Sequence, residues 1–157
     1  MKAKLFFTGA MLLVLVFTCS GYLHAQTGAA YTEAQHAIAA SNAKYHQAFA
    51  KNDSSIFINS YAEDACILAP GMQLVCGRGA IAHFFTDGYK MGIRGGKLVT
   101  TKLYGDGVDY ITEEGWGQIV DKDGKLIDEA KYIVVWKKTS EGWKMYRDIF
   151  NGNPVTK

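Results

Sequence analysis

The sequence predicts an α+β domain in which a curved, cone-shaped antiparallel sheet wraps around N-terminal helices. Two observations predict it. In the first part of the chain, apolar residues recur at helical spacing. From Lys97 onward they alternate with a period of two, in runs that short glycine-containing turns separate. Helices followed by a run of strands are typical of an α+β arrangement rather than of alternating β-α-β units.

The first 25 residues have the pattern of a secretory signal. A basic start precedes an apolar run over residues 5–17 and a small-residue exit at Ala25. That run of about 13 residues is shorter than the ~20 that a membrane-spanning helix needs, so we expect cleavage near Ala25 rather than a stable membrane span. Cys19 leaves a lipoprotein as the alternative.

The rest of the chain has the length of one domain, with a short flexible lead over residues 26–31 and a folded part over residues 32–157. The full chain of 157 residues has 17 basic and 15 acidic residues, and loss of Lys2 and Lys4 with the signal leaves 15 of each. A near-neutral domain lacks the basic surface typical of nucleic-acid binding. We therefore expect an exported protein, periplasmic or secreted, with no nucleic-acid partner.

Three helices are expected before the long strands. Thr32 and Gln35 have the spacing of a capping box at the start of the first helix, which we expect to end near Asn52. Ser54 is expected to cap a short second helix. The third helix is expected to open at Gly77 and to end in a glycine-rich segment.

Two short strands, over residues 66–69 and 72–75, flank the turn signal Pro70-Gly71. A hairpin centred there places Cys66 opposite Cys76, with Cβ atoms about 4.5–5.5 Å apart, near but above the ~3.8 Å that a disulfide prefers. A bridge and two unbridged, buried cysteines both fit this pattern. No second Cys or His pair lies at ligand spacing, so we expect no metal and no cofactor.

Four long strands follow, joined by short turns that imply antiparallel hairpins. Asp123-Gly124 is the strongest of these turn signals. The strands are expected over residues 97–104, 110–120, 126–138 and 143–150.

Two stretches resemble the nuclear transport factor 2-like superfamily. The first runs from Tyr61-Ala62-Glu63-Asp64-Ala65 through Pro70-Gly71 to Gly77-Arg78-Gly79-Ala80-Ile81, and the second is Glu141-Gly142-Trp143-Lys144-Met145-Tyr146-Arg147-Asp148. Within the superfamily the chain is most similar to the domain of unknown function 4440 and SnoaL-like groups. The resemblance implies the cone-shaped fold and a homodimer through the sheet face. It implies no single reaction, because this fold hosts several enzymes and also proteins that only bind or associate.

Ketosteroid isomerase, one enzyme with this fold, uses an aspartate base together with a tyrosine and a protonated aspartate. Tyr45 resembles the isomerase tyrosine in its spacing to Asp53. The base would fall at Ala69 and the second acid near Ile133 or Val134, and none of these side chains can carry a proton. Steroid isomerisation by that mechanism is therefore not expected.

Strand alternation predicts the wall of the cone. Side chains alternate between the two faces of a strand, so a cavity-facing Trp116 would bring Glu114 and Gln118 to the same side. A mostly apolar wall with a few polar groups is typical of a small-molecule cavity. The residues expected to line it are Tyr61, His83, Trp116, Gln118, Tyr132, Tyr146 and Phe150.

Glu114 and Asp148 are the candidate acid and base, with Tyr45 polarising a substrate oxygen. Loss of hydration in an apolar cone raises the pKa of a carboxyl group, so such a pair can divide the two roles. Alternatively, each carboxylate is salt-bridged to a neighbour such as Lys131 or Arg147. The sequence thus favours a pocket protein that binds a small, largely apolar molecule or serves as an association module. The alternative is a cofactor-independent acid/base enzyme of the isomerase, dehydratase or hydrolase type.

Overall fold

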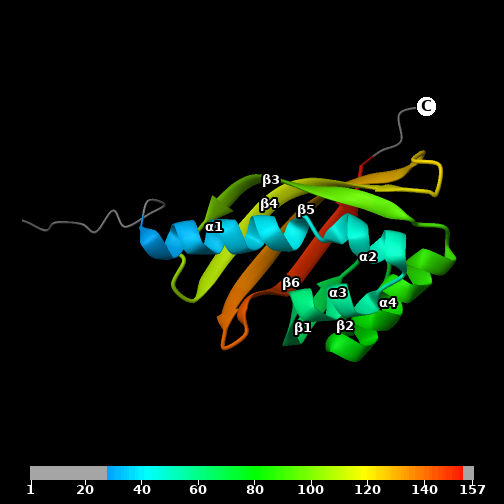
Figure 1. Cartoon of the computed structure of the whole chain (residues 1–157). Coiled ribbons are helices and arrows are strands. Elements are labelled where there is room, and N and C mark those ends of the chain that lie inside the picture. The colour runs from blue at the N-terminus through cyan, green and yellow to red at the C-terminus, as the bar shows by residue number, and fades with distance from the viewer. Residues whose placement is uncertain (1–27, 154–157) are drawn as a thin grey trace, which may run out of the picture.

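The computed structural model describes residues 28–153. This part of the chain contains four helices and six strands (Figure 1). The predicted signal, its cleavage point at Ala25 and Cys19 lie outside the described residues. The helices are α1 (Ala29–Asn42), α2 (Tyr45–Lys51), α3 (Ser54–Ser60) and α4 (Arg78–Lys90). The strands are β1 (Tyr61–Leu68), β2 (Val75–Cys76), β3 (Gly95–Tyr104), β4 (Tyr110–Val120), β5 (Leu126–Thr139) and β6 (Gly142–Gly152).

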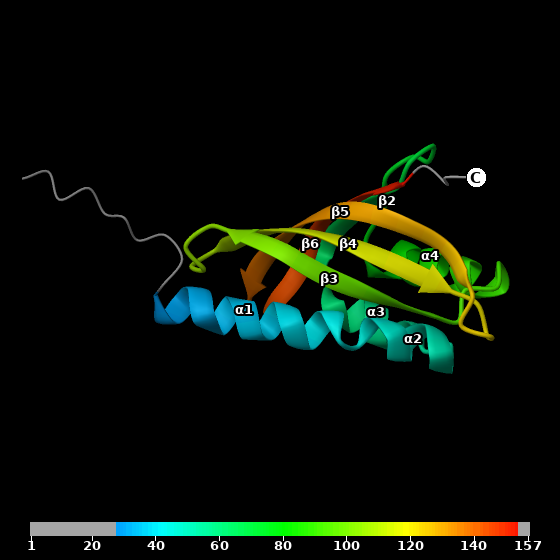
Figure 2. The same ribbon diagram turned by 90° about the horizontal axis from the view of Figure 1, so that it is seen from above.

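The strands form one curved, unclosed sheet in the order β2-β1-β6-β5-β4-β3, and α1 lies along one of its faces (Figure 2). Strands β3 to β6 are joined as antiparallel hairpins, as predicted. The pairing of β1 with β6 is parallel, which differs from the all-antiparallel sheet expected. Since the whole meander separates these two strands in sequence, no hairpin turn forces them to run in opposite directions.

The first helix differs from its prediction at both ends. It begins at Ala29, and Thr32 lies inside it, with its hydroxyl donating to the Gly28 carbonyl (3.3 Å). The predicted capping box therefore does not form, and residues 29–31 of the predicted lead are helical. The helix also ends at Asn42. A separate helix, α2, follows over Tyr45–Lys51 and is terminated by Asn52, which has a left-handed backbone conformation.

The second predicted helix corresponds to α3, but Asp53 caps it instead of Ser54. The Asp53 carboxylate accepts a hydrogen bond from the Ser55 backbone N–H (3.0 Å). An ionised carboxylate is a strong acceptor for the unpaired N–H groups of a first turn, so the acid replaces the hydroxyl. The third predicted helix is α4, which begins at Arg78.

The core lies between the helices and the sheet face that they cover, here called the concave face. Its largest fully buried side chains come from α1, α4 and the three strands β1, β4 and β5. Aromatic rings of α2, α3 and α4 pack together, with Phe57 and Phe85 stacked at a centroid distance of 3.7 Å. Each buried ring contributes roughly 1.5–3 kcal/mol. The largest of the fully buried side chains are Trp136, Ile38, Ile67, Ile81, Ile111 and Glu113.

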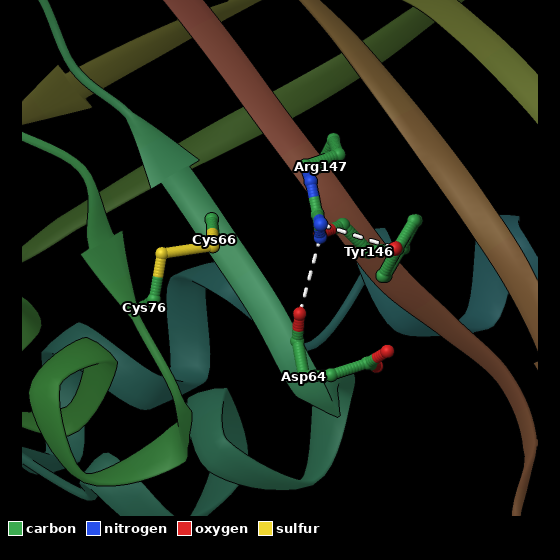
Figure 3. The surroundings of a disulfide bond; sticks show 5 residues. All are labelled: Asp64, Cys66, Cys76, Tyr146 and Arg147. Carbon is green, nitrogen blue, oxygen red and sulfur yellow. Dashed lines mark hydrogen bonds between the residues drawn. A yellow bond between two sulfur atoms is a disulfide. The ribbon is translucent and has the colours of Figure 1, made fainter.

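A disulfide joins Cys66 and Cys76 (Figure 3). The two residues are directly opposed in the β1–β2 pairing, as the predicted hairpin requires. The bond ties β1 to the residue that precedes the Gly77 cap of α4. Within residues 28–153 no helix combines the length and the apolar character needed to cross a membrane.

Candidate functional site

The side of β4 that faces the helices is the opposite of the predicted one. Glu113 has no exposed surface, whereas Glu114 is exposed and accepts a hydrogen bond from the Tyr104 hydroxyl (2.8 Å). The register agrees, because Glu113 pairs with buried Val134 and Glu114 pairs with exposed Ile133. The candidate acid Glu114 therefore lies on the outer face of the sheet and does not meet the proposed base.

Trp116 and Gln118 share this outer face, so the prediction that they line the interior is wrong. The Lys97 ammonium lies 4.8 Å from the centre of the Trp116 ring, and Gln118 donates to a carboxylate of β5 (2.9 Å). The reason lies on the inner side of β4. A Cβ on Gly115 would come within 2.4 Å of the Tyr132 ring, so the tyrosine occupies the space that a side chain of β4 would need.

Tyr146 also lies on the outer face, because β6 contains a bulge. Val135 pairs with Arg147 and Trp136 pairs with Met145, which leaves Tyr146 as the extra residue. The Arg147 guanidinium stacks over the Tyr146 ring at 3.7 Å and donates to its hydroxyl (3.0 Å), as Figure 3 shows. His83 was also expected to line the cavity, but its side chain is exposed on α4.

Three predicted residues do come together on the concave face. Oδ2 of Asp148 accepts a hydrogen bond of 2.5 Å from the Tyr61 hydroxyl. Loss of hydration, and then the charge of Asp148, raise the pKa of Tyr61 and of Tyr45 well above the ordinary tyrosine value. Both phenols therefore stay neutral near pH 7, and Tyr61 donates its one hydroxyl proton to the carboxyl group. This group of three, Asp148, Tyr61 and Tyr45, is called the tyrosine–carboxyl site below.

Asp148 is the titratable member of the site. Although its side chain is only half-buried, the surrounding protein removes enough water to raise the pKa of Asp148 to about 6. The bond from Tyr61 acts in the opposite direction, and the negative charge of Glu113 adds to the rise. Asp148 thus changes charge within the range where many biological reactions occur.

Glu113 is the interior carboxyl that the sequence reasoning missed. Its Oε1 accepts hydrogen bonds from Asn42 (2.8 Å), Thr100 (2.5 Å) and Tyr132 (2.7 Å), and its Oε2 accepts one from Trp136 (2.8 Å). These partners belong to α1, β3 and β5, so the carboxyl fastens the first helix to the sheet. Ile111, two residues earlier and fully buried, was the sequence signal that this side of β4 faces inward.

The two interior carboxyls differ in what they leave unsatisfied. Glu113 uses both oxygens, whereas among the described residues only Tyr61 donates to Asp148. The Tyr45 hydroxyl likewise has no hydrogen-bond partner among them, although its ring packs edge-on against Phe49 and Phe57. Free polar atoms on a half-exposed carboxyl and on a neighbouring phenol are what a ligand could bind.

A more voluminous hollow lies away from this site. A hollow of about 500 Å³ opens between β1 and the β5–β6 hairpin. Its cations are already paired, with Arg78 bound to Glu141 (2.6 Å) and Lys137 bound to Asp64 (3.1 Å). Volume alone would favour this hollow. The tyrosine–carboxyl site, however, contains a carboxyl group with a raised pKa and polar atoms without partners among the described residues. We therefore place the candidate site at the tyrosine–carboxyl site. No three His, Cys, Asp or Glu side chains of residues 28–153 are grouped so as to hold a metal ion.

No protein-family model and no curated protein matches the sequence. Solved structures do match. A nuclear transport factor 2-like protein with a cystatin-like fold from Novosphingobium aromaticivorans aligns with 80% of this chain and 85% of its own, at 18% identity and a TM-score of 0.68. This chain has the nuclear transport factor 2-like fold. At such low identity the likeness shows the fold alone.

Two further structures illustrate the range of this nuclear transport factor 2-like fold. A ketosteroid isomerase-like protein from Erwinia carotovora atroseptica is 17% identical over 74% of this chain and 95% of its own, with a TM-score of 0.61. A Xanthomonas campestris protein, provisionally named a calcium/calmodulin dependent protein kinase II association domain, is 22% identical over 83% of this chain and 91% of its own, with a TM-score of 0.60. These neighbours do not separate the subgroups of the fold, so the similarity to the domain of unknown function 4440 and SnoaL-like groups stays a prediction.

Proposed function

We propose that this domain binds a small, largely apolar molecule at the tyrosine–carboxyl site of its concave face. The free Oδ1 of Asp148 carries the proposal. This oxygen has no hydrogen-bond donor among the described residues and remains accessible at the surface of the site, so a ligand can reach it. Glu113, on the same face of the sheet, shows that this fold can satisfy a carboxyl completely. The unsatisfied oxygen therefore favours a functional role for Asp148.

The surroundings of Asp148 favour a mostly apolar ligand. Phe150 lies two residues along β6 and faces the same side of the strand. Its ring is 6.3 Å from that of Phe84 on α4, and the Phe85 ring is 6.0 Å from that of Tyr61. Apolar and aromatic walls with a few hydrogen-bonding groups are typical of small-molecule sites.

Binding is tested with two aromatic probes of one shape, 1-naphthylmethanol and 1-naphthylmethylamine, followed by amide chemical shifts in NMR spectra. We expect at least one probe to shift resonances around Asp148 and Tyr61, and Asp148→Asn to weaken its binding about tenfold, for loss of one hydrogen bond near 1.4 kcal/mol. Asp64→Asn, on the outer side of β1, is the matched control and should bind normally. If neither probe shifts these resonances, or if Asp148→Asn binds as well as the wild type, the proposal is wrong.

Proton transfer by Asp148 is the second candidate, and the pKa of about 6 favours it. A carboxylate of that basicity, poorly hydrated, is an effective general base near neutral pH. The Kemp elimination of 5-nitrobenzisoxazole tests it generically: the base takes the C3 proton as the N–O bond breaks, releasing 2-cyano-4-nitrophenolate. A rate above that of acetate buffer, falling below pH 6 and lost in Asp148→Asn, supports catalysis. A rate that Asp148→Asn leaves unchanged refutes it.

We also propose that two copies associate through the outer sheet face. Ile133 and Ile149 oppose each other across β5 and β6, with 46% and 43% of their surface exposed, and Leu68 is the next neighbour on β1. Exposed apolar pairs of this kind favour a protein contact. Light scattering should give twice the monomer mass for the wild type and the monomer mass for Ile133→Lys. Val108→Lys, in the exposed β3–β4 turn, should remain dimeric; a monomeric wild type contradicts the proposal.

Export is the remaining proposal, with the signal removed near Ala25. The basic start and apolar run of the sequence support it. The disulfide between Cys66 and Cys76 also supports it, since such bonds persist mainly in oxidising compartments. Mass spectrometry of the protein made in a Gram-negative host should find a chain that begins at Gln26. A chain that still begins at Met1, or one lipidated at Cys19, would contradict it.

A further inference from the structure

The concave face carries two carboxyls in one row across the sheet. Glu113 on β4, Val134 on β5 and Asp148 on β6 are cross-strand neighbours. Strand spacing of about 4.7–4.9 Å places the two acidic backbone positions roughly 10 Å apart. Because Glu113 is fully buried and Asp148 bonds to Tyr61, both carboxyls point toward the helices.

No described cation balances these charges. The ion pairs of residues 28–153 join lysines and arginines to other acids, nearer the surface. The titratable groups that act on Asp148 from the packed elements are neutral phenols and one more acid. They are Tyr45 of α2, Tyr61 of β1, Glu113 of β4 and Tyr132 of β5. Two uncompensated carboxyls in a poorly hydrated interior give a strongly negative potential, which attracts a cation.

Aromatic rings beside Asp148 reinforce this preference. Phe84 lies between Phe85 and Phe150, with ring centroids 5.4 Å and 6.3 Å away. The face of such a ring carries partial negative charge, and cations bind it with roughly 0.5–2 kcal/mol. A neutral hydroxyl gains no comparable attraction, and an anion would be repelled by the carboxyls.

An independent observation comes from Asn42. This residue is 8% exposed, and its Oδ1 is a buried acceptor with no hydrogen-bond partner among the described residues. Its Nδ2 donates to Glu113 (2.8 Å), so the amide belongs to the same interior cluster. The buried Oδ1 of Asn42 is an acceptor, and so is the free Oδ1 of Asp148, a carboxyl that bonds to Tyr61 rather than to this cluster. A partner that satisfies them must be a donor.

We propose that the molecule held at the tyrosine–carboxyl site carries a protonated amine, whose N–H groups donate to the free oxygen of Asp148 while its apolar part contacts Phe84 and Phe150. The inference depends on the binding function proposed above and adds the chemical class of the ligand. When the site is filled, the ammonium group supplies the counter-charge that Asp148 lacks.

The two naphthyl probes test the class because they differ in charge and hardly in shape. By calorimetry at pH 7.5, the wild type should bind 1-naphthylmethylamine at least tenfold more tightly than 1-naphthylmethanol. Asp148→Asn should reduce this ratio to less than twofold, and Asp64→Asn should leave it unchanged. In the wild type, lowering the pH to 5 should weaken amine binding severalfold and leave alcohol binding unchanged, because Asp148 then takes up a proton. The pH series needs no substitution, so it tests the inference even if a variant does not fold.

The outcomes separate the two proposals. If the alcohol binds at Asp148 as tightly as the amine, the amine class is wrong and the binding function stands. If the amine preference survives Asp148→Asn or pH 5, it originates elsewhere on the protein and the inference is overturned. If neither probe shifts the amide resonances around Asp148, the binding function and the inference fail together.

Discussion

Asp148 should make the stability of this protein fall as the pH rises, which is unusual for a carboxylic acid. Its pKa is about 6 in the folded chain and 3.8 is the ordinary value. The folded state therefore holds the proton more tightly than the unfolded state does. The stability that this proton provides is complete below about pH 3.8 and is lost as the pH rises through 6. A difference of about two pKa units corresponds to about 3 kcal/mol, which partial exposure of the side chain reduces to about 2.

The assay compares wild type with Asp148→Asn, which keeps the shape of the side chain and cannot ionise. Urea denaturation at pH 4, 5, 6 and 7 gives the free energy of unfolding of each, and the difference between the two cancels the titration of all other groups. We expect the wild type to lose about 2 kcal/mol relative to the variant between pH 4 and pH 7.

Asp64 supplies a control of opposite sign. It is an exposed carboxyl whose hydrogen bond from Lys137 holds its pKa below the ordinary value. Stability from this group is present above the unfolded pKa and is lost as the pH falls, so the difference between wild type and Asp64→Asn should grow with pH. A wild-type minus Asp148→Asn difference that is flat, or that also grows with pH, would refute the reasoning about Asp148.

Three further experiments test what stabilises the fold. Glu113→Ala removes the acceptor of four hydrogen bonds, so urea denaturation should show a loss of unfolding free energy above about 4 kcal/mol. A loss below about 2 kcal/mol would contradict the anchoring role. Gly115→Ala should lower the melting temperature more than Gly117→Ala. At position 115 the new Cβ would lie 2.4 Å from a tyrosine ring and 2.5 Å from a carbonyl oxygen. At position 117 it would lie 3.0 Å from a leucine side chain and 3.2 Å from a carbonyl oxygen. Equal melting temperatures would be inconsistent with that packing. Replacing Cys66 and Cys76 by alanine opens a loop of 10 residues and should reduce the free energy of unfolding by about 2.7 kcal/mol. The variant and the wild type are compared by urea denaturation without reductant. An unchanged free energy of unfolding would show that the disulfide does not stabilise the fold.

The hairpin strands could be predicted because their turns are encoded locally. The run Tyr110–Val120 and the start of β5 at Leu126 were predicted at the observed positions, and the turn signal Asp123-Gly124 lies between them. The pairing of Cys66 with Cys76 followed in the same way from one Pro-Gly turn. A short turn sets the direction and register of the two strands that it joins, so both can be predicted from the sequence.

The face of a strand is harder to predict, because it depends on what fills the other side. The alternation in β4 was recognised, but the large Trp116 was placed inside when Gly115 was the inward residue. The space over Gly115 is occupied by Tyr132 of another strand, a contact that no local pattern encodes. Because the predicted inward-facing residues of β4 were off by one position, Glu114 was assigned to the site and Glu113 was not.

The bulge in β6 had a similar effect at one position. It leaves Asp148 and Phe150 facing inward, as predicted, and turns Tyr146 outward to stack with Arg147. Bulges depend on the match between two strands rather than on the composition of one. The tyrosine–carboxyl site was therefore only partly predictable, with Asp148, Tyr61 and Tyr45 named and their arrangement known from the structure alone.

A carbon-13 NMR titration of the Asp148 carboxyl, with and without saturating 1-naphthylmethylamine, tests the central claim most directly. The account predicts a midpoint near pH 6 in the free protein, because loss of hydration favours the neutral acid. It also predicts a clearly lower midpoint with the amine bound, because the cation stabilises the carboxylate. A midpoint near 4 that the amine does not move would contradict the claim that this carboxyl is the ligand-binding group.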